Sequence, residues 1–206
     1  MRIVAVNAGD KGRLLLARWA ASGHNTTVIS SDVIAELNEP IDADIILVNF
    51  HGLPVSDKAT LLSYLDGKTI IDCTNVSSVN ELRSGSGSIA EDIAQACPSA
   101  SITKALNVIT PAALQHVLTH GGAMGRKGYV SAYYCGDDEQ AGRATAGLIA
   151  EAHLEPVDCG PLSNATLLEA LGLLAHQLEE HIAVGPHFAI GIIRAHDDSS
   201  PLDRWM

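Results

Sequence analysis

Aromatic and basic residues are scarce in this sequence. Only 4% of its 206 residues are Phe, Trp or Tyr, so a buried core must be built from aliphatic side chains. The 13 Lys and Arg are outnumbered by 24 Asp and Glu, which gives a formal net charge of −11. Binding to a nucleic-acid backbone relies on clustered basic side chains, so this balance disfavours nucleic acid as a partner.

Long apolar runs and closely spaced cysteines are missing as well. No apolar stretch approaches the roughly 18 residues that a membrane-spanning helix requires, and no basic amphipathic stretch suggests an anionic membrane surface. The four cysteines are too widely spaced to indicate a disulfide framework or a zinc knuckle. Arg2–Val6 has the pattern of a strand and not that of the apolar region of a secretory signal. We therefore expect a cytoplasmic, globular protein with no membrane as partner.

Short aliphatic runs alternate with amphipathic stretches along the chain, which is typical of βαβ units around a parallel sheet. With 47% hydrophobic residues the chain can bury a large core. We expect strands over Arg2–Val6, Thr26–Ser30, Asp44–Val48, Thr69–Asp72, Ser101–Lys104, Tyr129–Cys135 and Glu155–Cys159, with a final edge strand over Phe188–Ile193. We expect helices over Arg13–Ser22, Asp57–Leu65, Ser88–Cys97, Ala112–Leu118, Glu139–Ala152 and Asn164–Ala183, and loops over Thr74–Gly87 and Gly121–Gly128.

This order of elements predicts an α/β fold of Rossmann type, with a doubly wound, mostly parallel sheet and a short C-terminal helical part. Neither an internal repeat nor a linker divides the chain, so we expect a single domain over residues 1–206. Residues 164–206 would form a helix and a tail. Leucines at helical spacing from Leu167 to Leu178 are expected in the core or in the interface of a homodimer.

The segment between the first strand and the first helix has the pattern of a dinucleotide-binding turn. Such a turn needs glycines for the tight turn, for approach of the backbone to the pyrophosphate, and for close helix–strand packing. Gly9 and Gly12 occupy the second and third positions, and Asn7, which tolerates positive φ, occupies the first. An ordinary strand-to-helix turn is the alternative. The candidate nucleotide-binding residues here are Asn7, Ala8, Gly9, Asp10, Lys11 and Gly12.

The choice between NAD and NADP is made at the end of the second strand in this fold. Ser30 and Ser31 offer two hydroxyls to a 2′-phosphate, and Lys11 is the nearest cation in the sequence. Asp32 stands 20 residues beyond Gly12, near the position of an acid that binds the ribose of NAD, or it caps the next helix. The pattern favours NADP slightly.

Several segments spread along the chain carry a family resemblance. The chain resembles the NADPH-dependent reductases of the deazaflavin coenzyme F-420, which have a Rossmann fold and a short C-terminal helical part. The segments that carry this resemblance are Ala8–Gly12, Ser22–His24, Ser88–Ala94, Lys104–Asn107, Cys135–Glu139, Asp158–Asn164 and Leu167–Glu169.

The resemblance implies NADP(H) laid across the carboxyl ends of the strands, in contact with Ala8–Gly12 and with Ser30 and Ser31. It also implies a deazaflavin or another acceptor stacked near the nicotinamide. The sequence departs from the family pattern at three places: at Asn7, beside Ser30, where the usual arginine is missing, and after the third strand, where Asn49–Gly52 stands in place of the family's proline-containing turn. The residues implied near the nicotinamide and the acceptor are Asn49, Phe50, Thr74, Asn75 and Asn107.

The chemistry leaves several functions open. Hydride transfer between two rings depends on proximity and orientation rather than on a protein acid or base, and no catalytic dyad is visible. An imine, carbonyl or ferric chelate is the alternative acceptor, and a nucleotide-binding sensor without catalysis is the alternative class. An imine or carbonyl would require a proton donor, for which His51, Lys104 and Asn107 are placed at expected strand ends. A structural cation is favoured for Lys104, and a loop residue without a catalytic role for His51. His176, Glu179 and Glu180 share a helix face, but a solvated or dimer-forming face is favoured over a metal site.

Overall fold

The computed structural model describes residues 1–84, 87–121, 130–181 and 188–192. Its seven-stranded sheet has the order β2-β1-β3-β4-β5-β6-β7. All neighbouring strands run parallel except β5 and β6, which are antiparallel. The strands are β1 (Arg2–Val6), β2 (Asn25–Ile29), β3 (Ile45–Val48), β4 (Thr69–Asp72), β5 (Ser101–Ala105), β6 (Ser131–Gly136) and β7 (Glu155–Asp158). The predicted α/β Rossmann-type fold with a mostly parallel sheet is confirmed.

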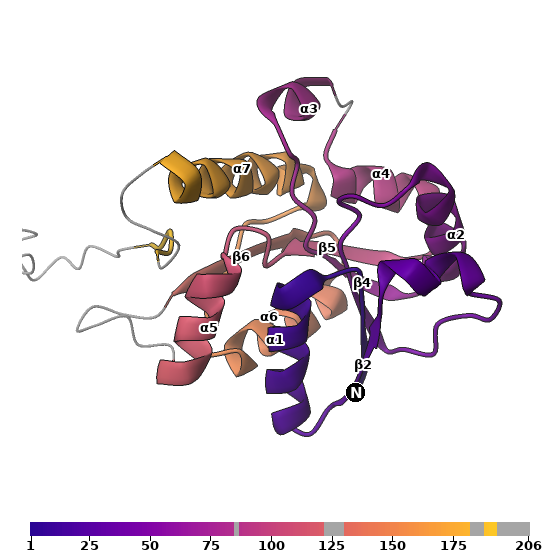
Figure 1. Ribbon diagram of the computed structural model, residues 1–206, viewed down its shortest axis with the longest axis horizontal. Coiled ribbons are helices and arrows are strands. Elements are labelled where there is room, and N and C mark those ends of the chain that lie inside the picture. Colours follow the sequence, from indigo (N-terminus) through magenta and orange to yellow (C-terminus); the bar gives the residue numbers. More distant parts are fainter. Residues whose placement is uncertain (85–86, 122–129, 182–187, 193–206) are drawn as a thin grey trace, which may run out of the picture.

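Helices cover both faces of the sheet (Figure 1). In this view α4 and α7 lie above the sheet, and α1, α5 and α6 lie below it. The helices are α1 (Gly9–Ala21), α2 (Val55–Leu65), α3 (Val79–Ser84), α4 (Ile89–Ala96), α5 (Pro111–His120), α6 (Glu139–Glu151) and α7 (Ala165–His181). Two short 3₁₀ helices, η1 (Ser31–Glu36) and η3 (Leu162–Asn164), complete the described elements.

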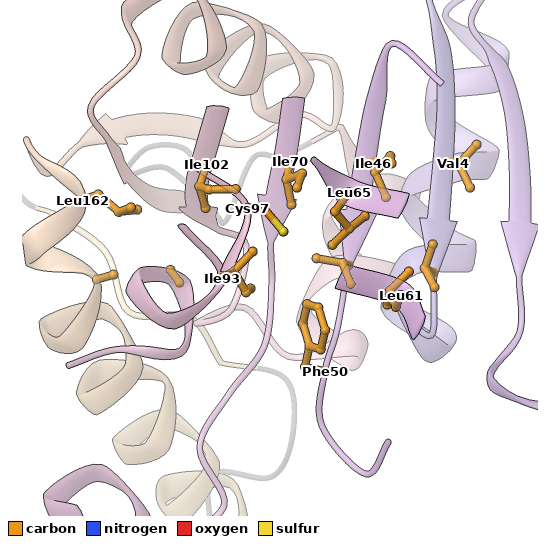
Figure 2. Packing of buried hydrophobic residues seen from close by; sticks show 14 of the residues in the cluster. Val4, Ile46, Phe50, Leu61, Leu65, Ile70, Ile93, Cys97, Ile102 and Leu162 are labelled. Atoms are coloured by element: carbon orange, nitrogen blue, oxygen red, sulfur yellow. The ribbon is translucent and has the colours of Figure 1, made fainter. Parts of the chain in front are cut away.

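The alternation of side chains along each strand divides the core into two layers. Val4, Ile46 and Ile70 face the layer covered by α2, α4 and α7, as Figure 2 shows for their contacts with the helical residues around them. Ile3, Leu47 and Ile71 face the opposite layer, which is covered by α1, α5 and α6. Because both faces are buried, the central strands are continuous aliphatic runs. The two layers fix the carboxyl ends of β1, β3, β4 and β5 side by side.

Local sequence signals explain where several helices begin. The predicted capping box at the start of α4 is present: the Ser88 hydroxyl accepts from the backbone of Glu91, whose carboxylate in turn accepts from the Ser88 backbone. Thr110 caps α5, with Pro111 in the first turn. Asp138 caps α6 by accepting from Ala141 N.

Three expectations differ from the structure. Helix α1 begins at Gly9 rather than at Arg13, because the residues of the nucleotide-type turn already form its first turn. The expected loop over Thr74–Gly87 contains α3, whose first turn is fixed by the Ser78 hydroxyl accepting from Glu81 N. The described residues 188–192 form no strand. The expected loop over residues 122–128 lies outside the described residues. Within the described part of the chain, no helix combines the length and the apolar character that crossing a membrane requires.

Candidate functional site

The turn after β1 has the geometry that a dinucleotide requires. Asn7 and Gly9 both have positive φ values, of 50° and 58°. A Cβ atom added at Gly12 would lie 2.3 Å from the Cβ of Ala8, so only glycine permits this close packing of α1 on the strand end. A Cβ at Gly9 would meet nothing within 4 Å, which leaves the backbone open to a ligand. The two glycines and Asn7 thus have the three properties of the glycine-rich turn.

Asn7 does more than replace a glycine. Its side-chain amide donates to the backbone oxygens of Asn49, at 2.8 Å, and of His51, at 3.0 Å. It therefore ties the turn after β1 to the segment that follows β3. These two strands flank the point at which the strand order changes direction, where ligands bind in open α/β sheets.

A cavity of about 300 Å³, here called the central cavity, lies at these strand ends. Lys11 of α1 and Asn49 after β3 line one part of it, and α7 lines another part with Gly172 and Glu179. The remaining lining residues come mostly from the segments after β4 and β5. They include Cys73, Asn75, Val76, Ser77, Asn107, Val108, Ile109 and Thr110.

Two asparagines form a bridge between β4, β5 and α7. The side chain of Asn75 donates to the backbone oxygen of Asn107 at 2.8 Å. The side chain of Asn107 donates to Leu168 O at 2.7 Å and to Asn75 Oδ1 at 3.1 Å. Gly172 packs against this pair so closely that an added Cβ would lie 2.3 Å from Asn75 Oδ1. Among the buried side-chain polar atoms of the described residues, Asn107 Oδ1 alone has no hydrogen-bond partner.

Lys11 reaches across the central cavity from α1 to the end of β5. Its ammonium group donates to Leu106 O at 2.8 Å and to Asn107 O at 3.4 Å. Leu106 has a φ value of 60°, which is unusual for a residue other than glycine. This φ value turns the Leu106 carbonyl out of the strand geometry. Burial lowers the pKa of Lys11 from its ordinary value.

Lys104 of β5, a candidate proton donor, occupies a closed site between β4, β5 and α7. Its ammonium group donates to Asp72 Oδ2 and Glu169 Oε1, both at 2.8 Å, and to Thr74 O at 2.6 Å. These three bonds use all three N–H donors of the ammonium group. Lys104 and Asp72 are fully buried, and Glu169 is 1% exposed. This favours the structural role for Lys104 over the role of proton donor.

Within this cluster, burial and the neighbouring opposite charges act in opposite directions on the pKa of Lys104 and on that of Glu169. Burial works to lower the pKa of Lys104, but Asp72 and Glu169 outweigh it and raise the pKa above its ordinary value. Burial raises the pKa of Glu169, and Lys104 opposes that rise. Glu169 Oε1 also accepts from Ile89 N, at the start of α4, at 2.9 Å. The cluster therefore connects β4, β5, α4 and α7.

A second cavity of about 440 Å³, here called the side cavity, adjoins the first. Phe50, Thr74 and Glu169 are part of its wall. The backbone N–H of Phe50 donates to the Thr74 hydroxyl at 2.9 Å, which fixes the segment after β3 against the segment after β4. His51, Asn75, Val76 and Ser77 line both cavities. His51 and Ser77 are themselves hydrogen-bonded, with 3.2 Å between Nδ1 and Oγ.

The structure brings most of the candidate residues together, but not all of them. Lys11, Asn49, Asn75 and Asn107 line the central cavity, and Phe50 and Thr74 line the side cavity. Ser30 and Ser31 lie where β2 ends and η1 begins, and they line neither cavity. The exposed Asp10 pairs with Arg13 at 3.6 Å, and Ala8 is buried.

Sequence reasoning missed the contribution of α7 to the site. Gly172, Ala175, His176 and Glu179 all line the central cavity. A glycine in the middle of a leucine-rich helix was the available signal, because glycine there is costly unless packing requires it. Within the described residues no cluster of His, Cys, Asp and Glu could hold a metal ion, and the side chains of Glu180 and His181 lie outside that description.

Comparison with known proteins finds likeness over most of the chain. The chain is 26% identical to metalloreductase STEAP3 of Rattus norvegicus over 185 residues, 84% of this chain, but it spans only 36% of the length of that relative. No protein-family model matches.

Solved structures are similar at lower identity. One is a protein of Arthrobacter sp. FB24 described as a candidate F420-dependent NADP-reductase, with a TM-score of 0.69 and 20% identity, covering 94% of this chain and 100% of that chain. Another is the imine reductase BcSIRED from Bacillus cereus BAG3X2, with a TM-score of 0.51 and 14% identity, covering 88% of this chain and 60% of that chain. These likenesses place the chain among proteins with the Rossmann-type α/β fold.

Proposed function

We propose that this protein is an NADP(H)-dependent oxidoreductase that transfers hydride between a nicotinamide and a deazaflavin- or flavin-like acceptor. The observation that carries the proposal is the turn at Asn7, Gly9 and Gly12, which has the required backbone geometry and lies beside the central cavity at the strand ends. The likeness to a candidate F420-dependent NADP-reductase and to a metalloreductase supports the same class of reaction.

The residues of the site fit such a cofactor. The open backbone at Gly9 and the N-terminus of α1 would hold the pyrophosphate, and Ser30 and Ser31 the 2′-phosphate. Asn49 and Asn75 would lie beside the nicotinamide and the acceptor, as would Asn107 with its unpartnered Oδ1, together with Phe50 and Thr74. Bound NADP(H) would supply the hydride, so the protein has only to hold two rings in contact and exclude water.

Calorimetric titration with NADPH and then with NADH tests this proposal. We expect micromolar binding of NADPH, and weaker binding of NADH because Ser30 and Ser31 would bind the 2′-phosphate. Gly9→Ala should weaken NADPH binding roughly tenfold or more, since the added methyl group obstructs the approach of a phosphate. Gly67→Ala is the matched control: Gly67 also has positive φ and open space, but it lies between α2 and β4.

Turnover is tested next, by mixing NADPH with the oxidised deazaflavin and following the absorbance of both. Oxidation of NADPH at the rate of deazaflavin reduction would support the proposal. Binding of neither nucleotide would overturn it. Binding without turnover of any acceptor would favour a nucleotide-binding sensor.

A ferric chelate or an imine is the second candidate for the acceptor. The sequence likeness to a metalloreductase favours the former, and the structural likeness to an imine reductase favours the latter. Turnover of NADPH with either compound, but not with the deazaflavin, would decide for this alternative.

We also propose that the protein forms a homodimer through α7. Leu167 is 67% exposed and Leu174 is 49% exposed, and Leu171 and Leu178 continue the same side of the helix at intervals of three and four residues. A dimer would remove this stripe from water. Sedimentation equilibrium should give twice the chain mass of 21.6 kDa, and Leu174→Asp should give the monomer mass. A monomer mass for the unmodified protein would contradict the proposal.

A further inference from the structure

The ammonium group of Lys11 lines the central cavity without an ion-pair partner among the described residues. Its two partners are the backbone oxygens of Leu106 and Asn107, and neither carries a full charge. The described residues form no ion pair with Lys11. An ammonium group has three N–H donors, so one remains for a further acceptor. Lys11 is partly buried, and a cation partly withdrawn from water without a counter-ion carries a cost that is recovered when an anion binds.

The groups around Lys11 offset its charge only in part. The charged and titratable groups that influence it are Cys73 after β4, Lys104 on β5 and Glu179 on α7. The Cys73 thiol has its pKa raised to about 11 by burial, so it is neutral near pH 7. Lys104 is positive and already paired with Asp72 and Glu169. Glu179 lines the cavity with Lys11 but forms no ion pair with it.

We infer that Lys11 binds the hydride acceptor and stabilises the negative charge that the acceptor gains on reduction. This inference rests on the proposed function and adds the charge class of the second substrate to it. A neutral deazaflavin that accepts hydride forms a new C–H bond, and a flavin forms a new N–H bond. Either ring takes up one negative charge, which spreads to its nitrogen and oxygen atoms. Bound NADPH would supply this hydride, which carries two electrons, so no further reactant is needed.

Lys11 therefore selects between the candidate acceptors. A deazaflavin- or flavin-like ring becomes anionic on hydride addition, and a cation within hydrogen-bond distance stabilises the product and the transition state leading to it. A protonated imine is already positive when it binds, and an ammonium group nearby would repel it. The charge of Lys11 thus favours an acceptor that is neutral before reduction and anionic afterwards.

The test measures binding rather than turnover alone. Oxidised deazaflavin is titrated into protein saturated with NADP⁺, and reduced deazaflavin into protein saturated with NADPH, because neither mixture can react. The ratio of the two dissociation constants is compared between variants, so the difference between the nucleotides cancels. Lys11→Met should reduce the preference for the reduced form by roughly tenfold or more. Lys11→Arg, which keeps the charge, should retain most of that preference.

Lys68→Met is the matched control, because Lys68 lies between α2 and β4 and lines neither cavity. It should leave the ratio unchanged. If NADPH and deazaflavin bind and react but Lys11→Met keeps the full preference, the inference about Lys11 is wrong and the proposed function stands. Weaker NADPH binding in Lys11→Met with an unchanged ratio would make Lys11 a nucleotide contact, which also overturns the inference. If the unmodified protein binds no nucleotide, the proposed function fails first, and the inference fails with it.

Discussion

Lys104→Met is expected to lower the free energy of unfolding by about 3–5 kcal/mol. The substitution removes the ammonium group that lies between Asp72 and Glu169, both of which are buried. It also leaves the backbone oxygen of Thr74 without its donor. Two buried carboxyl groups without a counter-charge are far more costly than the loss of an exposed ion pair. Urea denaturation monitored by circular dichroism measures the change.

A matched surface variant separates this effect from the general loss of an ion pair. Arg143→Met removes the partner of Glu139 on the exposed face of α6. Exposed pairs of this kind contribute little, so a change of less than about 0.5 kcal/mol is expected. Equal effects of the two substitutions would contradict the assignment of Lys104 as the buried structural cation.

The loss of unfolding free energy caused by Lys104→Met should increase with pH. Burial raises the pKa of Glu169 in the folded protein, and Lys104 opposes that rise, so removing Lys104 raises the pKa further. A carboxyl group with a raised folded pKa binds its proton more tightly in the folded state, so its unfavourable contribution grows as pH rises above the unfolded pKa. The variant should therefore be closer to the unmodified protein at pH 5 than at pH 7.5. A loss of unfolding free energy that increases as pH falls would contradict the assignment of this effect to Glu169.

Gly172→Ala is expected to destabilise the protein by about 1–3 kcal/mol, although alanine is the better helix former. The new methyl group would lie 2.3 Å from Asn75 Oδ1 and 2.7 Å from Asn107 Nδ2. Neither amide can swing aside freely, because both hold hydrogen bonds that join β4, β5 and α7. Either α7 moves outward or the bridge breaks, and both changes alter the central cavity. Under the proposed function, NADPH binding should weaken as well.

Gly147→Ala is the control for helix propensity. Gly147 lies inside α6, and an added Cβ there would meet nothing within 4 Å. The same substitution should therefore stabilise the protein by roughly 0.5–1 kcal/mol. Thermal unfolding of the two variants should shift the midpoint in opposite directions. A stabilised Gly172→Ala would show that α7 does not pack on the asparagine pair.

Local signals in the sequence were sufficient to predict most of the elements. Aliphatic runs bounded by turn residues gave the strands, and the capping box at Ser88 gave the start of α4. The missed helix α3 has only six residues and lies in a segment rich in Ser and Asn, where periodicity carries little information. The position of Asn7, Gly9 and Gly12 between a strand and a helix was readable because backbone geometry at a turn depends on adjacent residues.

The roles of the two lysines were decided only by the tertiary structure. The sequence places Lys11 in a turn and Lys104 at a strand end, and both positions are compatible with a catalytic or a structural cation. Asp72 and Glu169, the partners of Lys104, lie 32 and 65 residues away from it, and Leu106 O, the partner of Lys11, lies 95 residues away. The charge state and availability of a side chain depend on such distant partners. The sequence by itself therefore determined the fold and the turn, whereas the packing of α7 over the strand ends decided which residues line the cavity and which cation remains free to bind a ligand.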